Sequence, residues 1–125
     1  MLGDRDATVT LAVKDLDTAK AFYEGVVGLR PAGFDLPGGA LYKSGNTMVL
    51  VYESEFAGTN QATAAGWNVG DDFDTLVDEL RGKGVTFEHY DLPGLTLDGD
   101  VHVGEDFRTV WFKDPDGNIL NLVNM

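Results

Sequence analysis

The chain has 125 residues, of which 43% are hydrophobic, so it is long enough to bury a core within one domain. Its formal net charge of −12 argues against binding to nucleic acids or to anionic membranes, because both depend on Lys and Arg contacts. There is no cysteine, which excludes disulfides, a thiol nucleophile and cysteine metal ligands. The chain shows no apolar leader and no apolar run of about 18 residues, and we therefore expect a cytoplasmic protein.

The first half of the chain predicts a strand, a helix and a second strand. Residues 7–13 alternate in polarity, which predicts a strand that turns Thr8 and Thr10 to one face and its larger apolar residues to the other. Over residues 19–27, apolar side chains recur at the spacing of one helix face. A short strand is expected over residues 29–34, at an edge or a bulge because it contains a proline.

A β-hairpin is predicted over residues 39–53. Gly45 and Asn46 favour a two-residue turn, although Ser44 leaves other loop lengths open. The polar residues 54–63 that follow form the predicted linker between the two halves. With a two-residue turn, the hairpin places the following side chains on one face: Ala40, Tyr42, Ser44, Thr47, Val49 and Val51.

The second half repeats the order of the first. A strand is predicted over residues 64–69, a helix over 73–80 and an alternating strand over 85–90. A long loop, 91–104, precedes a closing hairpin over 110–123, which turns at the sequence DPDGN.

We therefore predict an α+β fold made of two copies of one βαβββ module within a single domain. The first copy spans about residues 5–53 and the second about 64–125, joined by the linker. In each copy the helix covers one face of the strands with its apolar stripe, and the other face is left for a cavity or a partner.

The closing hairpin carries the most informative polar residue. Asn121 interrupts an apolar strand, so it should either be hydrogen-bonded or face a cavity. The face of Trp111 depends on the turn: a five-residue loop pairs Trp111 with Ile119, and a four-residue loop reverses it. Trp67 is expected on the helix side of its strand, where core packing is its default role.

Two segments resemble the vicinal oxygen chelate superfamily, which includes glyoxalase I, extradiol dioxygenases, fosfomycin-resistance enzymes and bleomycin-resistance proteins. They are the opening VTLAVKDLDTAKAFYEGVVGL and the closing WFKDPDGNILNLV, and the likeness extends over essentially the whole chain. The resemblance implies that the two modules curve into a U-shaped mixed sheet around the site, with the helices on the outer face. It also implies a homodimer. One departure is a spare residue between Val69 and the second helix.

Members of this superfamily with metal chemistry carry His or Glu at inward-facing strand positions. By the resemblance, the matching positions here are Thr8, Val49, Ala64 and Asn121. A hydroxyl, two aliphatic groups and a carboxamide do not make a ligand set for Fe²⁺, Mn²⁺, Ni²⁺ or Zn²⁺. We therefore expect no metal and no cofactor.

Our leading hypothesis is a metal-independent protein that resembles the bleomycin-resistance branch and binds a small organic ligand. Its acidic surface either favours a cationic ligand or serves only to keep the protein soluble. The predicted ligand-binding residues are Thr8, Thr10, Tyr42, Val49, Val51, Ala64, Trp111 and Asn121.

Two alternatives stay open. The first is a glyoxalase-like lyase or isomerase, which would use metal-free acid–base chemistry or a metal held by His89, His102, Glu105 or Asp106. These residues would otherwise be ordinary surface or loop side chains of an acidic segment. The second is a degenerate domain that serves only as an interaction partner.

Overall fold

The computed structural model describes the backbone of residues 1–125 and every side chain except that of Asp35. The internal contacts of the chain divide it into two units, and each is described by itself. Unit 1 comprises Met1–Thr59 with Pro115–Asn118, and unit 2 comprises Asn60–Asp114 with Ile119–Met125. The boundary between Thr59 and Asn60 lies within the predicted linker. No helix in the described part of the chain has the length and apolar character needed to span a membrane.

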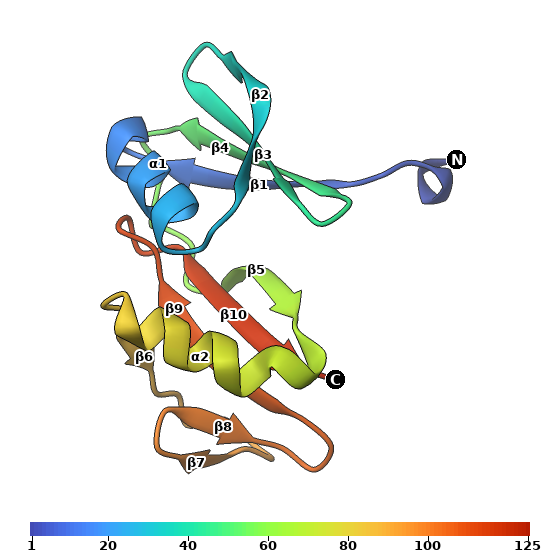
Figure 1. Ribbon diagram of the computed structural model, residues 1–125, viewed down its shortest axis with the longest axis vertical. Helices are drawn as coiled ribbons and strands as arrows, with labels where there is room; N and C mark the ends of the chain where they lie inside the picture. Colours follow the sequence, from blue (N-terminus) through green and yellow to red (C-terminus); the bar gives the residue numbers. More distant parts are fainter. The chain divides into compact units, whose positions relative to one another are not determined.

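Unit 1 is a four-stranded sheet with one long helix, as the sequence predicts. Its strands run in the order β1-β4-β3-β2, with β1 parallel to β4 and the other pairs antiparallel. Figure 1 shows α1 against one face of this sheet. The elements are η1 (Leu2–Asp4), β1 (Thr8–Val13), α1 (Leu16–Gly25), β2 (Arg30–Leu36), β3 (Gly39–Ser44) and β4 (Thr47–Glu53).

The register of the β3–β4 hairpin is the predicted one, but the prediction that Tyr42, Val49 and Val51 face a cavity together with Thr8 and Thr10 is wrong. Ser44 pairs with Thr47, so the turn has two residues. Tyr42, Val49 and Val51 are nevertheless buried on the α1 side, with exposed fractions of 1%, 2% and 0%. The parallel pairing sets Val49 beside Val9 and Val51 beside Leu11, on the face opposite Thr8 and Thr10. The residues between them on β4 are also apolar, so polarity gave no contrast between the two faces.

Unit 2 repeats the topology of unit 1. Its first strand, β5, again runs parallel to its last, β10, and β10 is antiparallel to β9. The predicted repeat of two βαβββ modules is therefore confirmed. The elements are β5 (Thr63–Asn68), η2 (Gly70–Asp72), α2 (Phe73–Gly82), β6 (Phe87–Glu88), β7 (Thr96–Asp98), β8 (Val101–Val103), β9 (Arg108–Lys113) and β10 (Ile119–Asn124).

The second module differs from its prediction in two places. The predicted strand over 85–90 is reduced to β6, and the predicted loop over 91–104 contains the hairpin β7–β8. The two changes are linked, because β6 pairs with one half of β9, at Trp111 and Phe112, and β8 pairs with the other half, at Arg108 and Thr109. The spare residue before the second helix is taken up by the 3₁₀ turn η2.

In the DPDGN turn between β9 and β10, Pro115–Asn118 belong to unit 1, whereas the two strands that the turn joins belong to unit 2. The Asn118 side-chain amide donates a hydrogen bond to the carbonyl of Ala12 at 2.7 Å. The backbone N–H of Lys14 donates to the Asp116 carboxylate at 3.1 Å. These two bonds hold the turn against the end of β1, which explains why so short a segment carries several polar residues.

Candidate functional site

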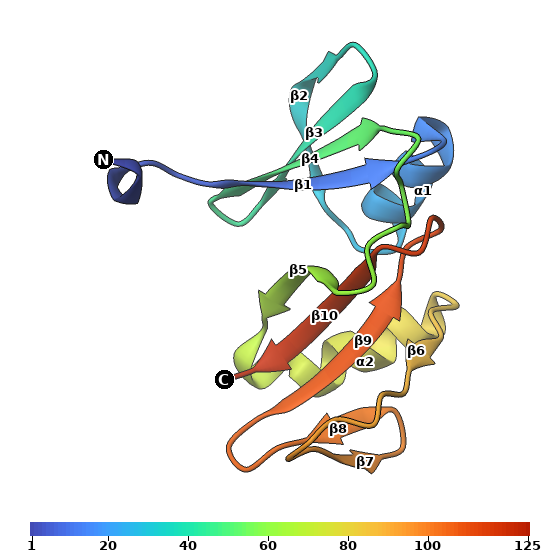
Figure 2. The same cartoon turned by 180° about the vertical axis from the view of Figure 1, so that it is seen from behind.

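The two faces of the unit 2 sheet differ in what covers them. One face of the sheet is covered by α2, and Phe112, Leu120 and Leu122 are buried on it. In Figure 2, α2 lies behind β9 and β10, so the opposite, uncovered face of the two strands is turned to the viewer. Trp111 pairs with Asn121 in the antiparallel register, so both side chains lie on that other face. Trp67 on β5 pairs with Leu122, which places it on the helix side, as predicted.

The uncovered face bears a hollow of about 550 Å³, which we call the β9–β10 hollow. Its wall includes part of the segment 91–104, which was predicted only as a long loop. Every side chain that lines it is apolar or uncharged. The lining residues are Leu92, Pro93, Leu95, Phe107, Thr109, Trp111, Asn121, Val123 and Met125.

Trp111 is fixed in this wall from three sides. Its indole N–H donates a hydrogen bond to the Thr63 hydroxyl at 3.0 Å. The Tyr90 ring meets it edge to face at 5.5 Å between centroids, and the His102 ring does so at 4.8 Å. Such perpendicular aromatic pairs are favourable beyond the area they bury, so the indole is held in one orientation.

Asn121 forms the polar part of the floor. Its side-chain NH₂ donates to the Thr109 hydroxyl at 3.1 Å, and that hydroxyl donates in turn to the carbonyl of Leu122 at 2.8 Å. The Asn121 oxygen lies so close above the Cα of Gly66 that a Cβ at this position would overlap it. A glycine opposite Asn121 is therefore required for the amide to point as it does.

We expect the substitution Gly66→Ala to displace the Asn121 amide from Thr109. The lost hydrogen bond lowers the free energy of unfolding by about 1 kcal/mol. In an Asn121→Ala background the overlap is absent, and alanine should then be the better strand residue by about 0.5 to 1 kcal/mol. Urea unfolding of the two single variants and the double variant measures this reversal of sign. Equal costs in both backgrounds would contradict the contact.

His102 is a buried histidine with a defined hydrogen-bonding state. Its exposed fraction is 0%, and its Nε2 accepts a hydrogen bond from the backbone N–H of Tyr90 at 2.9 Å. Burial lowers the pKa of His102, which favours the neutral ring, and burial followed by the charge of Glu88 raises the pKa of the Tyr90 hydroxyl. In the described part of the structure, His102 Nδ1 and the Tyr90 hydroxyl have no hydrogen-bond partner.

The lowered pKa of His102 predicts a loss of stability in mild acid. A histidine whose folded-state pKa lies below its unfolded value of about 6.5 stabilises the fold above that pH, and the contribution is lost as the pH falls below it. Urea unfolding from about pH 8 to about pH 5 should therefore show falling stability. His102→Gln, which keeps a hydrogen-bonding side chain but does not titrate, should flatten the profile. A slope that is unchanged in His102→Gln would contradict this assignment.

His89, the other histidine, belongs to a separate ionic cluster. Its Nε2 lies 2.8 Å from an oxygen of Asp100, whose other oxygen accepts a hydrogen bond from Arg81 at 3.0 Å. The hydrogen bonds of His89 and then of Arg81 hold the pKa of Asp100 below its usual range. Arg81 also pairs with Asp78 at 2.9 Å. The two histidines therefore have different roles: His89 pairs with Asp100, and His102 accepts a hydrogen bond from the backbone of Tyr90.

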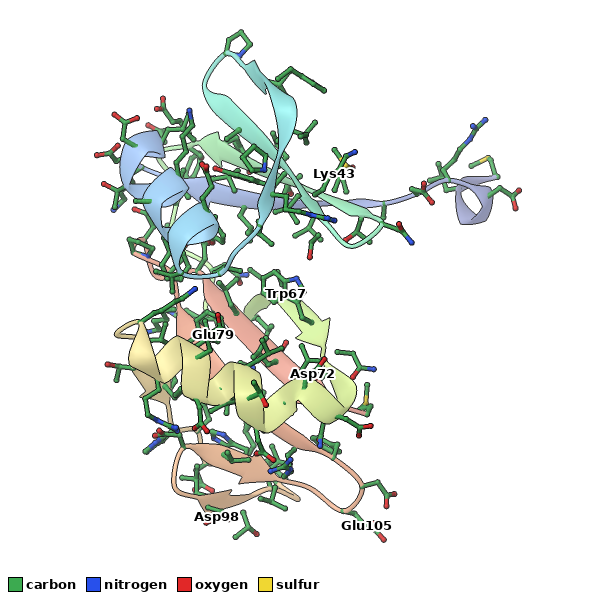
Figure 3. All side chains as sticks on the ribbon, in the orientation of Figure 1. Lys43, Trp67, Asp72, Glu79, Asp98 and Glu105 are labelled. Carbon is green, nitrogen blue, oxygen red and sulfur yellow. The ribbon has the colours of Figure 1, made fainter. Side chains whose placement is uncertain are left out.

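The residues present do not fit a divalent metal site. Within the described side chains, no three His, Asp or Glu residues lie close enough together to hold an ion. Glu105 is exposed and projects from the loop that follows β8 (Figure 3), while His102 is buried with Nε2 already occupied. At the positions matched by family resemblance, Val49 is a core residue of unit 1, and Asn121 offers only a carboxamide. No metal-dependent step can be derived from these groups.

The predicted ligand-binding residues do not all come together. Trp111 and Asn121 line the β9–β10 hollow. Ala64 lies half-buried on β5, and Thr8 and Thr10 are exposed on the face of β1 that α1 does not cover. Tyr42, Val49 and Val51 are core residues of unit 1, so the prediction that they share a cavity wall with the two threonines is wrong.

Sequence reasoning also missed part of the lining. Thr109 and Val123 lie two residues from Trp111 and Asn121 along their strands, so the alternation of the strands could have found them. The turn has five residues, one of the two lengths considered, but the strand partner predicted for Trp111 with that length was wrong. The five-residue turn pairs Lys113 with Ile119, so Trp111 pairs with Asn121. No sequence signal indicated that the segment after Tyr90 would form a wall.

The sequence profile of the Glyoxalase/Bleomycin resistance protein/Dioxygenase superfamily matches residues 7–122. The chain belongs to this superfamily. The match covers both modules, in agreement with the repeated topology. Among proteins of curated function, none matches the chain.

Solved structures of other proteins share the fold of this superfamily member. An integron cassette protein from the mobile metagenome of the Halifax Harbour sewage outfall is 19% identical, with a TM-score of 0.72 over 98% of this chain and 99% of that one. Lactoylglutathione lyase from Agrobacterium tumefaciens is 21% identical, with a TM-score of 0.71 over 97% and 93%. The fosfomycin resistance protein FosX from Mesorhizobium loti is 19% identical, with a TM-score of 0.69 over 100% and 94%. At these identities the likeness establishes the fold alone.

Proposed function

We propose that this superfamily member binds a small organic molecule in the β9–β10 hollow, without a metal ion and without transforming it. The proposal corresponds to the bleomycin-resistance branch of the superfamily rather than to its enzymes. The observation that carries it is the hollow itself, whose volume of about 550 Å³ lies within the range of small-molecule sites. An apolar lining with a few fixed polar groups is the usual composition of such a site.

The absence of a fitting ligand set favours binding over metal-assisted chemistry. His102 is buried and its Nε2 accepts a backbone hydrogen bond, and His89 is paired with Asp100. A general base must reach the proton that it removes, and neither histidine is among the residues that line the hollow. Binding in such a site gains from burial of apolar area, at about 25 cal/mol per Å².

The test is calorimetric titration of the protein with three naphthalene probes of one size: 2-naphthylmethanol, 2-naphthylmethylamine and 2-naphthoic acid. We expect at least one of them to bind at a single site per chain, and to bind equally well in the presence of EDTA. Phe107→Ala removes an aromatic side chain from the hollow and should weaken that binding about tenfold. Phe56→Ala is the matched control, because Phe56 is 69% exposed and belongs to unit 1.

Three outcomes would contradict the proposed function. They are no binding of any probe, binding that is indifferent to Phe107→Ala, and binding that EDTA abolishes. Turnover of lactoylglutathione by protein loaded with Fe²⁺, Ni²⁺ or Zn²⁺ would favour the enzyme alternative instead.

We also propose that the protein is a homodimer. Each sheet has open edges, at β1 and β2 in unit 1 and at β5 and β7 in unit 2. Unpaired edge strands favour association with another chain, and pairing two copies is one way to cover them. Light scattering at micromolar concentration should give twice the 13.5 kDa of one chain, and a mass of 13.5 kDa would refute the dimer.

A further inference from the structure

We infer that the ligand of the β9–β10 hollow is an uncharged, mostly apolar compound that carries one hydrogen-bonding group. This inference rests on the proposed function and goes beyond it by assigning the chemical class of the ligand. It also departs from the cationic ligand that was one of the two interpretations of the acidic composition.

The side chains of the lining offer no counter-charge to a charged ligand. None of its nine side chains is acidic or basic. Glu88 pairs with Trp111 in the β6–β9 register and therefore lies on the same face, but it forms an ion pair with Lys113 at 3.2 Å. A charged group that settles in this hollow would lose part of its hydration and meet no oppositely charged side chain in the lining, which is unfavourable.

The polar atoms of the lining are almost all engaged with one another. The Trp111 N–H donates to Thr63, and the Thr109 hydroxyl donates to the carbonyl of Leu122 while it accepts from Asn121. Asn121 uses one of its two amide hydrogens in this way. Its second amide hydrogen and its side-chain oxygen are left to bond a ligand, which allows one hydroxyl, carbonyl or amide group on an otherwise apolar body.

The acidic surface does not reverse this preference. The acidic residues labelled in Figure 3 are exposed on η2, α2, the β7–β8 hairpin and the loop after it: Asp72, Glu79, Asp98 and Glu105. Exposed charges are screened over about 8 Å at physiological ionic strength, so their attraction for a cation in the hollow is weak. A charged group that settles against this apolar lining still gives up part of its hydration, and that loss is the larger of the two effects.

The experiment compares the affinities of the three naphthalene probes at pH 7, where the methanol is neutral, the methylamine cationic and the carboxylic acid anionic. We expect 2-naphthylmethanol to bind at least about tenfold more tightly than either charged probe. Its Kd should change less than about twofold between about 0.15 M and about 0.5 M salt, because no charge is involved. A methylamine or naphthoate that binds as tightly as the alcohol would overturn the inference and leave the proposed function standing. If no probe binds, the proposed function itself fails.

A substitution at Asn121 tests the single hydrogen-bonding group. Asn121→Leu keeps the approximate shape of the side chain and removes its polar atoms, and it should weaken the binding of 2-naphthylmethanol about fivefold to tenfold. The binding of 2-methylnaphthalene, which has no hydroxyl, should be unchanged or tighter. Thr75→Leu, at an exposed position on α2, is the control for an added leucine. Equal losses for both probes would show that Asn121 only shapes the wall, and would overturn this part of the inference.

Discussion

Tyr42→Ala is expected to lower the free energy of unfolding by about 3 to 5 kcal/mol, the usual cost of deleting a large buried aromatic ring. Tyr42 is 1% exposed beneath α1, and its hydroxyl donates a hydrogen bond to Glu24 of that helix at 2.8 Å. The substitution therefore leaves a cavity and also removes a link between β3 and α1. Small domains have about 5 to 15 kcal/mol of stability in total, so this variant should be close to unfolding. Urea denaturation followed by far-UV circular dichroism measures the loss.

Two control substitutions separate the contributions of the ring and its hydroxyl. Tyr42→Phe keeps the ring and removes the hydroxyl with its hydrogen bond to Glu24, and it should cost about 1 kcal/mol. Thr10→Ala, at an exposed position on the uncovered face of β1, should change the stability by less than about 0.5 kcal/mol. If Tyr42→Ala cost no more than Thr10→Ala, Tyr42 would line an open cavity, as the sequence alone had suggested.

Gly58→Ala is expected to destabilise the protein by about 2 to 5 kcal/mol. Gly58 has a φ of +75°, where a side chain costs about 1 to 2 kcal/mol. A Cβ at this position would also overlap the backbone carbonyl oxygen of Asp116 in the DPDGN turn, which adds about 1 to 3 kcal/mol for overpacking. The turn cannot easily move aside, because Asn118 and Asp116 bond the end of β1. Thermal and urea unfolding should both report the loss.

Gly28→Ala is the matched control for the steric part of this cost. Gly28 has a similar φ of +81°, but no atom lies within 4 Å of the position that its Cβ would take. It should therefore cost only the backbone strain of about 1 to 2 kcal/mol. The difference in the free energy of unfolding between the two variants measures the overlap of the new Cβ at position 58 with the DPDGN turn. Equal costs would show that the turn is not packed against Gly58.

The sequence by itself determined the repeated module and most of its elements. Alternating polarity located β1, the helical spacing of apolar residues located α1 and α2, and turn residues located the β3–β4 hairpin. These signals are local, because the period of a strand or a helix is set within a few residues by the direction of successive side chains. The family resemblance rested on the opening strand and helix and on the closing hairpin, and the superfamily profile agrees with it.

Only the tertiary structure decided which face of each strand would be buried. The parallel pairing of β1 with β4 joins residues that are far apart in the chain, and a shift of one residue reverses every side chain of a strand. This is why Tyr42, Val49 and Val51 were assigned to a cavity when they belong to the core. The side chains of β4 are apolar on both faces, so their polarity could not reveal the error.

The candidate site depends on the same kind of long-range information. Asn121 stood out in the sequence because a lone amide in an apolar strand needs a partner, but its partner Thr109 and the glycine beneath it are set by strand pairing. The backbone N–H of Tyr90, at the start of the wall, donates to His102, a residue that the sequence suggested as a surface or loop group, a metal ligand or a general base. Local patterns thus determined the elements of this protein, and the pairing of distant strands decided where its hollow lies and what chemistry it offers.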